Sequence, residues 1–403
     1  MPFEIAISGV RAAQADLNVI GNNIANASTT GFKSSRAEFQ DVYAASNVGA
    51  AGDAPGAGVS TARVAQEFTQ GNVTFTNNGM DLAINGSGFF MVNDNGAELY
   101  TRDGSFGLDR NGYIVNSNSQ KLVAYATDKL GNPTGALGPL QISMADTAPN
   151  PTTSVSVGVN LNSSAPALSA ASFDPTNSAT YTNTTATTIY DSLGGAHSMQ
   201  VYFLKTGPGA WNVYNYVDGT AVGGANPITF GTSGALATPA GGAITLPSFT
   251  ASGGGAPMNV TMDLGTATQF GSAFGINKIT QDGYTSGHVS AIDIDKSGII
   301  FARYTNGQSS VQGQIAIANF ANPQALQPLG KNNWAATFAA GDVVRGTPGS
   351  SNLGVIQSGA LEDSNVDLPD QLVKLIVAQR NFQANTQVIQ TANAVTQSII
   401  NIR

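Results

Sequence analysis

Residues 3–27, FEIAISGVRAAQADLNVIGNNIANA, decide the fold at the N-terminal end of this chain. Their apolar side chains recur at heptad spacing, which is typical of a coiled-coil seam. One heptad position holds Phe3, Val10, Leu17 and Ile24, and the second holds Ala6, Ala13, Ile20 and Ala27. The pattern predicts an amphipathic helix from residue 2 to about residue 27, ended by the breakers STTG of residues 28–31.

A second apolar stripe runs along the C-terminal end. Its members are Leu368, Leu372, Leu375, Ala378, Phe382, Asn385, Ile389, Ala392, Val395 and Ile399. Asp367 is the predicted N-cap of this helix, with Pro369 in the first turn and Asp370 at the capping-box position. Asn385 and Gln379 lie near the stripe, where they either set the register or face water.

The two terminal stripes together predict a polymerisation seam. Each helix alone leaves too much apolar surface exposed, so we expect the helices to pair and still to need neighbouring subunits. In a lone subunit we expect them to be largely disordered. The side chains predicted to form the seam are Phe3, Val10, Leu17, Ile20, Ile24, Leu368, Leu372, Leu375, Phe382, Ile389, Val395 and Ile399.

The long middle of the chain has the pattern of β-structure. Short β-rich segments such as residues 89–92 alternate with turn dipeptides, which predict hairpins because Asn-Gly accepts positive φ values. These dipeptides are Asn78-Gly79, Asn85-Gly86, Asn95-Gly96, Asp103-Gly104 and Asn111-Gly112. The predicted fold class is therefore a mainly β, multi-domain core, with two β domains of which one is inserted in the other. Terminal α-helices are predicted to form a coiled-coil-like inner layer beside it.

Composition shifts predict four parts. The hairpin style of the first β segment returns after Tyr284, which suggests a domain inserted at a loop tip. The predicted parts are a terminal helical domain (1–30 plus 364–403), a connector (31–70 plus 359–363), an inner β domain (71–144 plus 285–358) and an inserted outer β domain (145–284). The connector has Phe32, Phe39, Val42 and Tyr43 as anchors, and its Gly/Ala-rich residues 44–59 are expected to form a mobile loop.

Charge and residue usage exclude several function classes. Charged residues are 10% of the chain, against about 25% in ordinary globular proteins, and the net charge is -8. Without a Lys/Arg stripe to neutralise phosphates, nucleic acid is not expected as a partner. Cysteine is absent, which excludes disulfides and thiolate sites. His197 and His288 are expected to be isolated imidazoles, and no metal or cofactor site is predicted.

Targeting and catalytic signals are equally sparse. No apolar run approaches the roughly 18 residues of a membrane-spanning helix, so membrane insertion is not expected. The N-terminus lacks the basic and apolar regions of a Sec-type signal peptide, so the chain is expected to be cytosolic or to leave by another route. Asp293 and Asp295 alternate along a predicted strand, which suggests either a hydrolase pair or a polar outer face ending in a turn. The polar face is the better interpretation.

Three motifs resemble those of the bacterial flagellar rod and hook protein family. Residues 21–33, GNNIANASTTGFK, resemble its N-terminal signature, and residues 364–385, SNVDLPDQLVKLIVAQRNFQAN, its C-terminal signature. Residues 81–90, DLAINGSGFF, add a third match. Rod proteins of the family are much shorter and lack the large insert, so the resemblance points to the hook member. A distal rod protein is the alternative within the family, and an extracellular adhesin or surface-layer β protein is the alternative outside it.

The resemblance implies a structural role rather than an enzyme. Hook subunits stack helically into a hollow, curved tube that transmits torque from rod to filament as a universal joint. Its implied partners are further copies of the chain, the rod, hook cap and hook–filament junction proteins, and the flagellar type III export apparatus. The implied location is the flagellar basal body and hook, outside the cell after export. Phe39 and Tyr43 resemble the short hydrophobic element by which such subunits engage the export gate.

Overall fold

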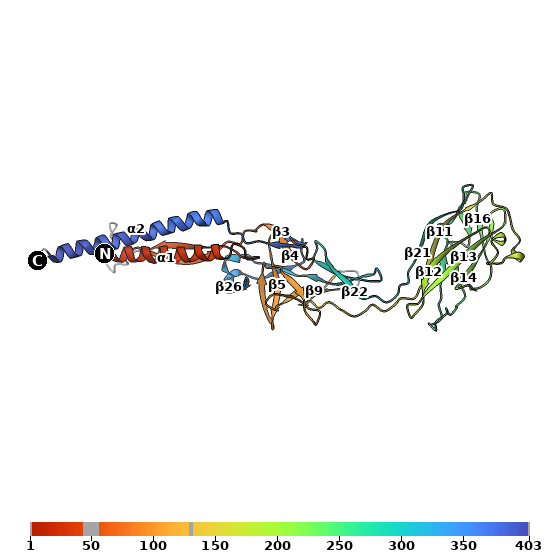
Figure 1. Ribbon diagram of the computed structural model, residues 1–403, viewed down its shortest axis with the longest axis horizontal. Coiled ribbons are helices and arrows are strands. Elements are labelled where there is room, and N and C mark those ends of the chain that lie inside the picture. The colour runs from red at the N-terminus through yellow and green to blue at the C-terminus, as the bar shows by residue number, and fades with distance from the viewer. Residues whose placement is uncertain (1, 43–55, 129–131, 402–403) are drawn as a thin grey trace. The chain divides into compact units, whose positions relative to one another are not determined.

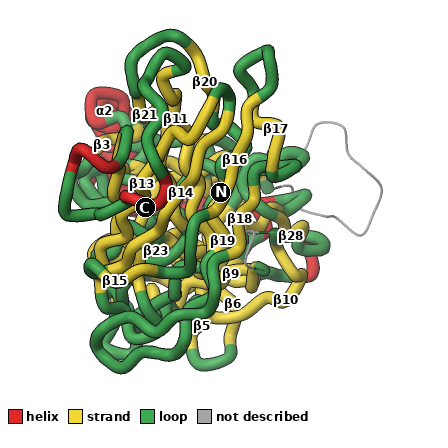
Figure 2. The backbone as a smooth tube through the Cα atoms, turned by 90° about the vertical axis from the view of Figure 1, so that its right-hand side faces the viewer, coloured by secondary structure: helices red, strands yellow, loops and turns green. Residues whose placement is uncertain are grey.

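The computed structural model describes residues 2–42, 56–128 and 132–401. The chain forms two compact units. Unit 1 comprises residues 1–143, 291–303 and 309–403, and unit 2 comprises residues 144–290 and 304–308. Outside the two terminal helices, the described residues form strands, loops and single 3₁₀ turns (Figure 2). The mainly β fold class with helices at both ends is confirmed. None of the described helices is long and apolar enough to cross a membrane.

The two long helices belong to unit 1 and lie side by side (Figure 1). They are α1 (Pro2–Ala25) and α2 (Leu368–Asn401). Asn23 contacts Gln371 near one end and Gly9 lies against Asn385 near the other, so the helices are antiparallel. In this register, residues 392–401 of α2 extend past the first residues of α1. The Asp367 cap is confirmed, because its Oδ1 accepts a hydrogen bond of 3.1 Å from the Asp370 N–H.

The largest sheet of unit 1 has 13 strands among the described residues. Its main path is β22 (Val289–Ile294), β23 (Ile299–Tyr304), β24 (Ser309–Ile315), β9 (Lys121–Thr127), β5 (Phe89–Asp94), β6 (Ala97–Thr101), β27 (Asn333–Ala335) and β26 (Gln327–Gly330). Off this path lie β7 (Phe106–Leu108), β8 (Ile114–Asn116), β10 (Pro133–Pro139), β25 (Ile317–Asn319) and β28 (Val344–Gly346). Short 3₁₀ turns η3 (Pro323–Ala325) and η4 (Phe338–Ala340) follow β25.

Three two-stranded pairs complete unit 1. They are β1 (Ser35–Asp41) with β2 (Val59–Gln66), β3 (Val73–Phe75) with β30 (Ala360–Glu362), and β4 (Leu82–Asn85) with β29 (Val355–Ser358). The last two pairs join the start of the β region to the segment just before α2. A buried core of Leu82, Phe90, Leu122, Ile315 and Ile356 therefore draws on both halves of unit 1.

Unit 2 is a sandwich of two sheets. One contains β11 (Ser154–Asn162), β18 (Ala243–Thr245), β19 (Thr261–Asp263), β20 (Thr268–Phe270) and β21 (Gly275–Gln281). The other contains β12 (Asn183–Tyr190), β13 (Ala196–Gly207), β14 (Ala210–Val217), β15 (Thr220–Ala221), β16 (Asn226–Phe230) and β17 (Leu236–Thr238), and η1 (Ala170–Ser172) and η2 (Ser178–Thr180) precede it. Val157 of the first sheet and Phe203 and Trp211 of the second share one buried core. Unit 2 thus has a core of its own.

The predicted hairpins are only partly correct. Asn95-Gly96 is a two-residue turn between paired strands β5 and β6, with φ of 52° and 103°. Asn111-Gly112 lies in the loop between β7 and β8. The other three dipeptides do not connect strands that pair with each other in the described sheets. For Asn78-Gly79 and Asn85-Gly86 the reason is that β3 and β4 pair instead with strands from the far end of the chain, which no local turn signal reveals. Asp103-Gly104 lies between β6, which pairs with β5 and β27, and β7, which pairs with β8.

The predicted connector contains a sheet. Strands β1 and β2 pair antiparallel from Ser35 opposite Gln66 to Asp41 opposite Val59. Phe39 and Val42 are exposed, so neither is an anchor as expected. Tyr43 and most of the expected mobile loop, residues 43–55, lie outside the described residues.

Candidate assembly site

The side of α1 that faces α2 is built from small residues. Ala6, Ala13 and Ile20 are buried, with 2%, 7% and 3% of their surface exposed. Val10, Leu17 and Ile24 of the other heptad position are half-buried, and Phe3 is 43% exposed. The structure therefore brings the alanine position of the predicted stripe, rather than the large one, into the helix contact. Small side chains permit this close approach.

Gly9 is a point of close approach between the two helices. A Cβ atom placed on Gly9 would lie 2.5 Å from Oδ1 of Asn385, so Asn385 does lie at the seam. Beside this contact is a groove of about 450 Å³ between α1, α2 and the β1–β2 pair, lined by Ile5, Ala12, Asp16, Phe39, Val59 and Asn381 among others. Burial raises the pKa of the Asp16 carboxyl, and the charge of Lys374 partly offsets the effect.

Much of the apolar surface of α2 is not covered by α1. Ala378 is buried, and Leu375, Phe382 and Ile389 are half-buried in the helix contact. The exposed apolar side chains, here called the outer apolar set, are Leu368, Leu372, Val373, Ile376, Val377, Val388, Val395 and Ile400, each 44–65% exposed. The side chain of Ile399 lies outside the described residues. The predicted seam residues thus divide into those that face α1 and those that face outward.

A buried asparagine joins the bases of the two helices. Asn23 has 1% of its surface exposed, and its side chain makes three hydrogen bonds. Its Nδ2 donates to Oε1 of Gln371 at 3.2 Å and to the carbonyl of Ser35 at 2.7 Å, and its Oδ1 accepts from the Ser35 N–H at 2.9 Å. Because the amide is satisfied as donor and acceptor, it ties α1 to α2 and to β1 without leaving a buried polar group unpaired.

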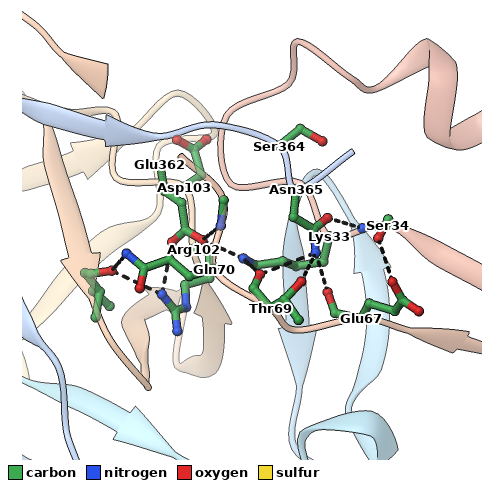
Figure 3. A network of polar contacts seen from close by, with 12 residues as sticks. Lys33, Ser34, Glu67, Thr69, Gln70, Arg102, Asp103, Glu362, Ser364 and Asn365 are labelled. Carbon is green, nitrogen blue, oxygen red and sulfur yellow. Dashed lines mark hydrogen bonds and ion pairs between the residues drawn. The ribbon is translucent and has the colours of Figure 1, made fainter. Parts of the chain in front are cut away.

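A buried ion cluster lies next to this joint (Figure 3). The carboxylate of Glu362 accepts hydrogen bonds from Lys33 Nζ at 2.5 Å, Arg102 Nη1 at 3.0 Å and the Gly71 N–H at 2.9 Å. The side chains of Lys33 and Glu362 are fully buried, and that of Arg102 is 5% exposed. Burial lowers the pKa values of both Lys33 and Arg102, and the Glu362 carboxylate opposes this shift.

Sequence reasoning missed this cluster. Lys33 belongs to the quoted N-terminal motif, so a lysine directly after a glycine and an aromatic residue was a usable signal. Glu362 lies outside the quoted motifs, and Arg102 stands before one of the turn dipeptides. Nothing local indicates that these charges meet, because Lys33 and Glu362 are 329 positions apart.

The remaining candidate residues behave as structural groups. Asp293 forms an ion pair with Arg303, and Asp295 accepts hydrogen bonds from the N–H groups of Ser297 and Ile299, both at 2.9 Å. The polar strand ending in a turn accounts for both carboxylates. Over the described ranges, no group of three or more His, Cys, Asp or Glu side chains is arranged to hold a metal ion.

The expectation of isolated imidazoles is wrong. His197 is buried, and its Nδ1 lies 2.6 Å from Asp218 Oδ2 while its Nε2 lies 3.4 Å from Asp191 Oδ2. His288, which is exposed, pairs with Asp146. Strand pairing brings these carboxylates to the histidines, and sequence spacing does not reveal it.

Comparison with known families divides the chain in order. Residues 3–33 match the family described as flagella basal body rod protein, and residues 83–160 match the flagellar hook protein FlgE/F/G D1 domain. Residues 160–284 match the flagellar basal body protein FlaE D2 domain, and residues 357–402 match the flagellar basal body rod FlgEFG protein C-terminal region. Asn23, Gln371, Lys33 and Glu362 lie within the terminal matches.

Full-length relatives carry one description. The flagellar hook protein FlgE of Salmonella typhimurium is 40% identical over 413 residues, covering 100% of both chains. The protein of the same name from Escherichia coli is 39% identical over 416 residues, again over 100% of both chains. The crystal structure of Helicobacter pylori flagellar hook protein FlgE2 aligns with a TM-score of 0.53 at 15% identity, over 72% of this chain and 100% of that one. This structural likeness supports the fold.

Proposed function

Because the chain belongs to the flagellar hook protein family, we propose that it is the structural subunit of a hollow, curved hook that acts as a universal joint between rod and filament. The homopolymer is built by helical stacking of subunits. In it, α1 and α2 form the inner layer, and the β units form the layers outside. This role needs exposed surfaces that become buried only between copies.

The outer apolar set of α2 is the observation that carries this proposal. Its eight members are exposed in the single chain, although burial of each side chain would lower the free energy. Burying one such side chain contributes roughly 1.5 to 3 kcal/mol. Exposed apolar surface of this extent on a soluble subunit is typical of an assembly interface. With charged residues at only 10% of the chain, mutual repulsion between copies is weak.

Salting-out followed by electron microscopy tests the proposal. We expect the purified full-length chain to form tubes. Ile376→Asp should prevent them, because a carboxylate would enter the contact between copies, whereas the lone subunit tolerates it since Ile376 is 49% exposed. Ile376→Leu is the matched control and should form tubes. Tubes of normal abundance from Ile376→Asp would contradict a role for the outer apolar set.

The family indicates the location and the main partners of the chain, and we propose further partners from it. The family places the chain in the flagellar hook, as a homopolymer that adjoins the rod. We further propose contacts with the hook cap and hook–filament junction proteins, and passage through the flagellar type III export apparatus to the cell exterior. The exposed Phe39 supports the export proposal, because a side chain that is 41% exposed is accessible for contact with another protein.

Export can be tested at Phe39. Phe39→Ala should lower secretion of the subunit while its cytoplasmic level stays normal. Val64→Ala is the control, since Val64 is an exposed apolar residue, 53% accessible, on the paired strand β2. Immunoblotting of medium and cells measures both quantities. If Phe39→Ala and Val64→Ala are secreted equally well, Phe39 is not part of the export signal.

A further inference from the structure

Glu362 stands where three parts of unit 1 meet. It is the last residue of β30 and lies six positions before α2 begins, whereas Lys33 lies eight positions after α1 ends. Arg102 comes from the β region directly after β6. One carboxylate therefore contacts the chain after α1, the chain before α2 and the β unit between them (Figure 3).

The contacts of this carboxylate leave it little freedom. Both oxygens accept hydrogen bonds, and the backbone carbonyl of Glu362 accepts another from the Gly31 N–H at 2.8 Å. Lys33 Nζ also donates to the carbonyl of Thr69 at 2.6 Å, and Arg102 Nη2 donates to the carbonyl of Gly86 at 2.8 Å. Since all three charged side chains are buried, removing the carboxylate would leave two cations without a counter-ion.

A second series of hydrogen bonds connects the segments that hold Lys33 and Glu362 to both helices. Asn365 Oδ1 accepts from the Ser34 N–H at 2.7 Å, and its Nδ2 donates to the carbonyl of Glu67 at 2.7 Å. Ser35 is held by Asn23 of α1, and Asn23 holds Gln371 of α2. Ser35, two positions after Lys33, is thus bonded directly to the base of α1, defined as residues 20–25, and Asn23 links it to the base of α2, defined as residues 368–375.

We propose that Glu362 is a positioning residue for the terminal helices: in the single subunit it holds the two helix bases side by side, so that pairing of α1 and α2 starts at Asn23 and Gln371 and extends toward the chain termini. Helix formation is limited by an unfavourable nucleus, and bringing distant segments together costs loop-closure entropy. A preformed base reduces both costs within the single chain. The inference concerns the single subunit and does not depend on tube formation.

Hydrogen exchange of the unassembled full-length chain tests this role. Glu362→Gln should raise the exchange rates of the helix-base amides by about tenfold or more, because the cations lose their counter-ion and the base opens locally. Among the described residues, strand β9 of the same unit shares no hydrogen bond or ion pair with the cluster and should change far less. Glu98→Gln is the matched control, since the Glu98–Arg345 pair of 2.7 Å is exposed, and it should leave the helix bases unchanged.

Two results would overturn the inference. Either the helix bases exchange at the unaltered rate in Glu362→Gln, or β9 loses protection by the same factor, which would mean that the cluster only stabilises unit 1. If Glu362→Gln does not fold, Lys33→Met decides, because it breaks the bond through which Glu362 holds the chain after α1 and keeps the Glu362–Arg102 pair. Faster exchange confined to the helix bases supports the role, and unchanged exchange rejects it.

Discussion

At the scale of single residues, the two carboxylates around His197 make unit 2 sensitive to pH. Burial alone would lower the pKa of the imidazole, but the hydrogen bonds and charges of Asp218 and Asp191 outweigh burial and raise it. The hydrogen bond from His197 holds the pKa of Asp218 below its ordinary range. The protonated imidazole is therefore the form that the folded unit prefers.

The sign of the pH effect follows from these shifts. Because the folded pKa of His197 lies above its unfolded value, the stabilisation is complete below about pH 6.5 and is lost as the pH rises through the folded pKa. We expect the unfolding free energy of unit 2 to fall over this pH range. Urea unfolding followed by Trp211 fluorescence in a Trp334→Phe background measures it, since these are the two tryptophans of the chain.

Matched variants isolate the histidine responsible. His197→Gln should remove this dependence between neutral and mildly alkaline pH. His288→Gln should keep it, because the His288 side chain is 76% exposed to solvent. An identical pH profile in His197→Gln and the unaltered chain would show that other groups cause the effect.

At the scale of elements, the unequal lengths of the two helices matter most. The helix α2 has 34 residues and α1 has 24, so the last turns of α2 extend beyond the described part of α1. In the single chain the two helices already pair along the length of α1. We therefore now expect disorder in a lone subunit only for the last turns of α2, residues 392–401. Isolated helical turns are unstable in water, so their order must come from neighbouring subunits.

Polymerisation should therefore be coupled to helix formation in α2. We expect amides of residues 392–401 to exchange rapidly in the monomer and slowly in the tube, with residues 368–375 protected in both. Helical circular dichroism should rise on assembly. Protection of residues 392–401 in the monomer would contradict the coupling and favour a complete intramolecular helix pair.

At the scale of the whole molecule, each unit has its own buried core, so one can be removed without opening the other. We propose that unit 2 governs the bending of the tube rather than its assembly. A chain that joins residue 143 to residue 291 through a short Gly/Ser linker should form tubes with altered curvature or stiffness. Electron microscopy measures both, and Trp334 fluorescence checks that unit 1 is folded. Failure to form any tube would make unit 2 part of the assembly core.

Local sequence was enough to locate the terminal helices and many strands. The apolar period, the Asp367 cap and the Asn95-Gly96 turn act through neighbours a few positions apart, so the local structure that they favour does not depend on the rest of the fold. The family motifs at both ends were also visible without a structure. For this reason the fold class and the family could be predicted from the sequence.

Tertiary structure alone decided which of the predicted residues meet. Whether Ala13 or Leu17 faces α2 depends on how closely the helices approach, and both positions fit the heptad equally well. Lys33, Arg102 and Glu362 are brought together by strand pairings between distant parts of the chain, whereas His197 meets its carboxylates through the consecutive strands β12, β13 and β14. Charges that are hydrated in the unfolded chain become a positioning cluster only when burial removes their water, and no local pattern encodes that burial.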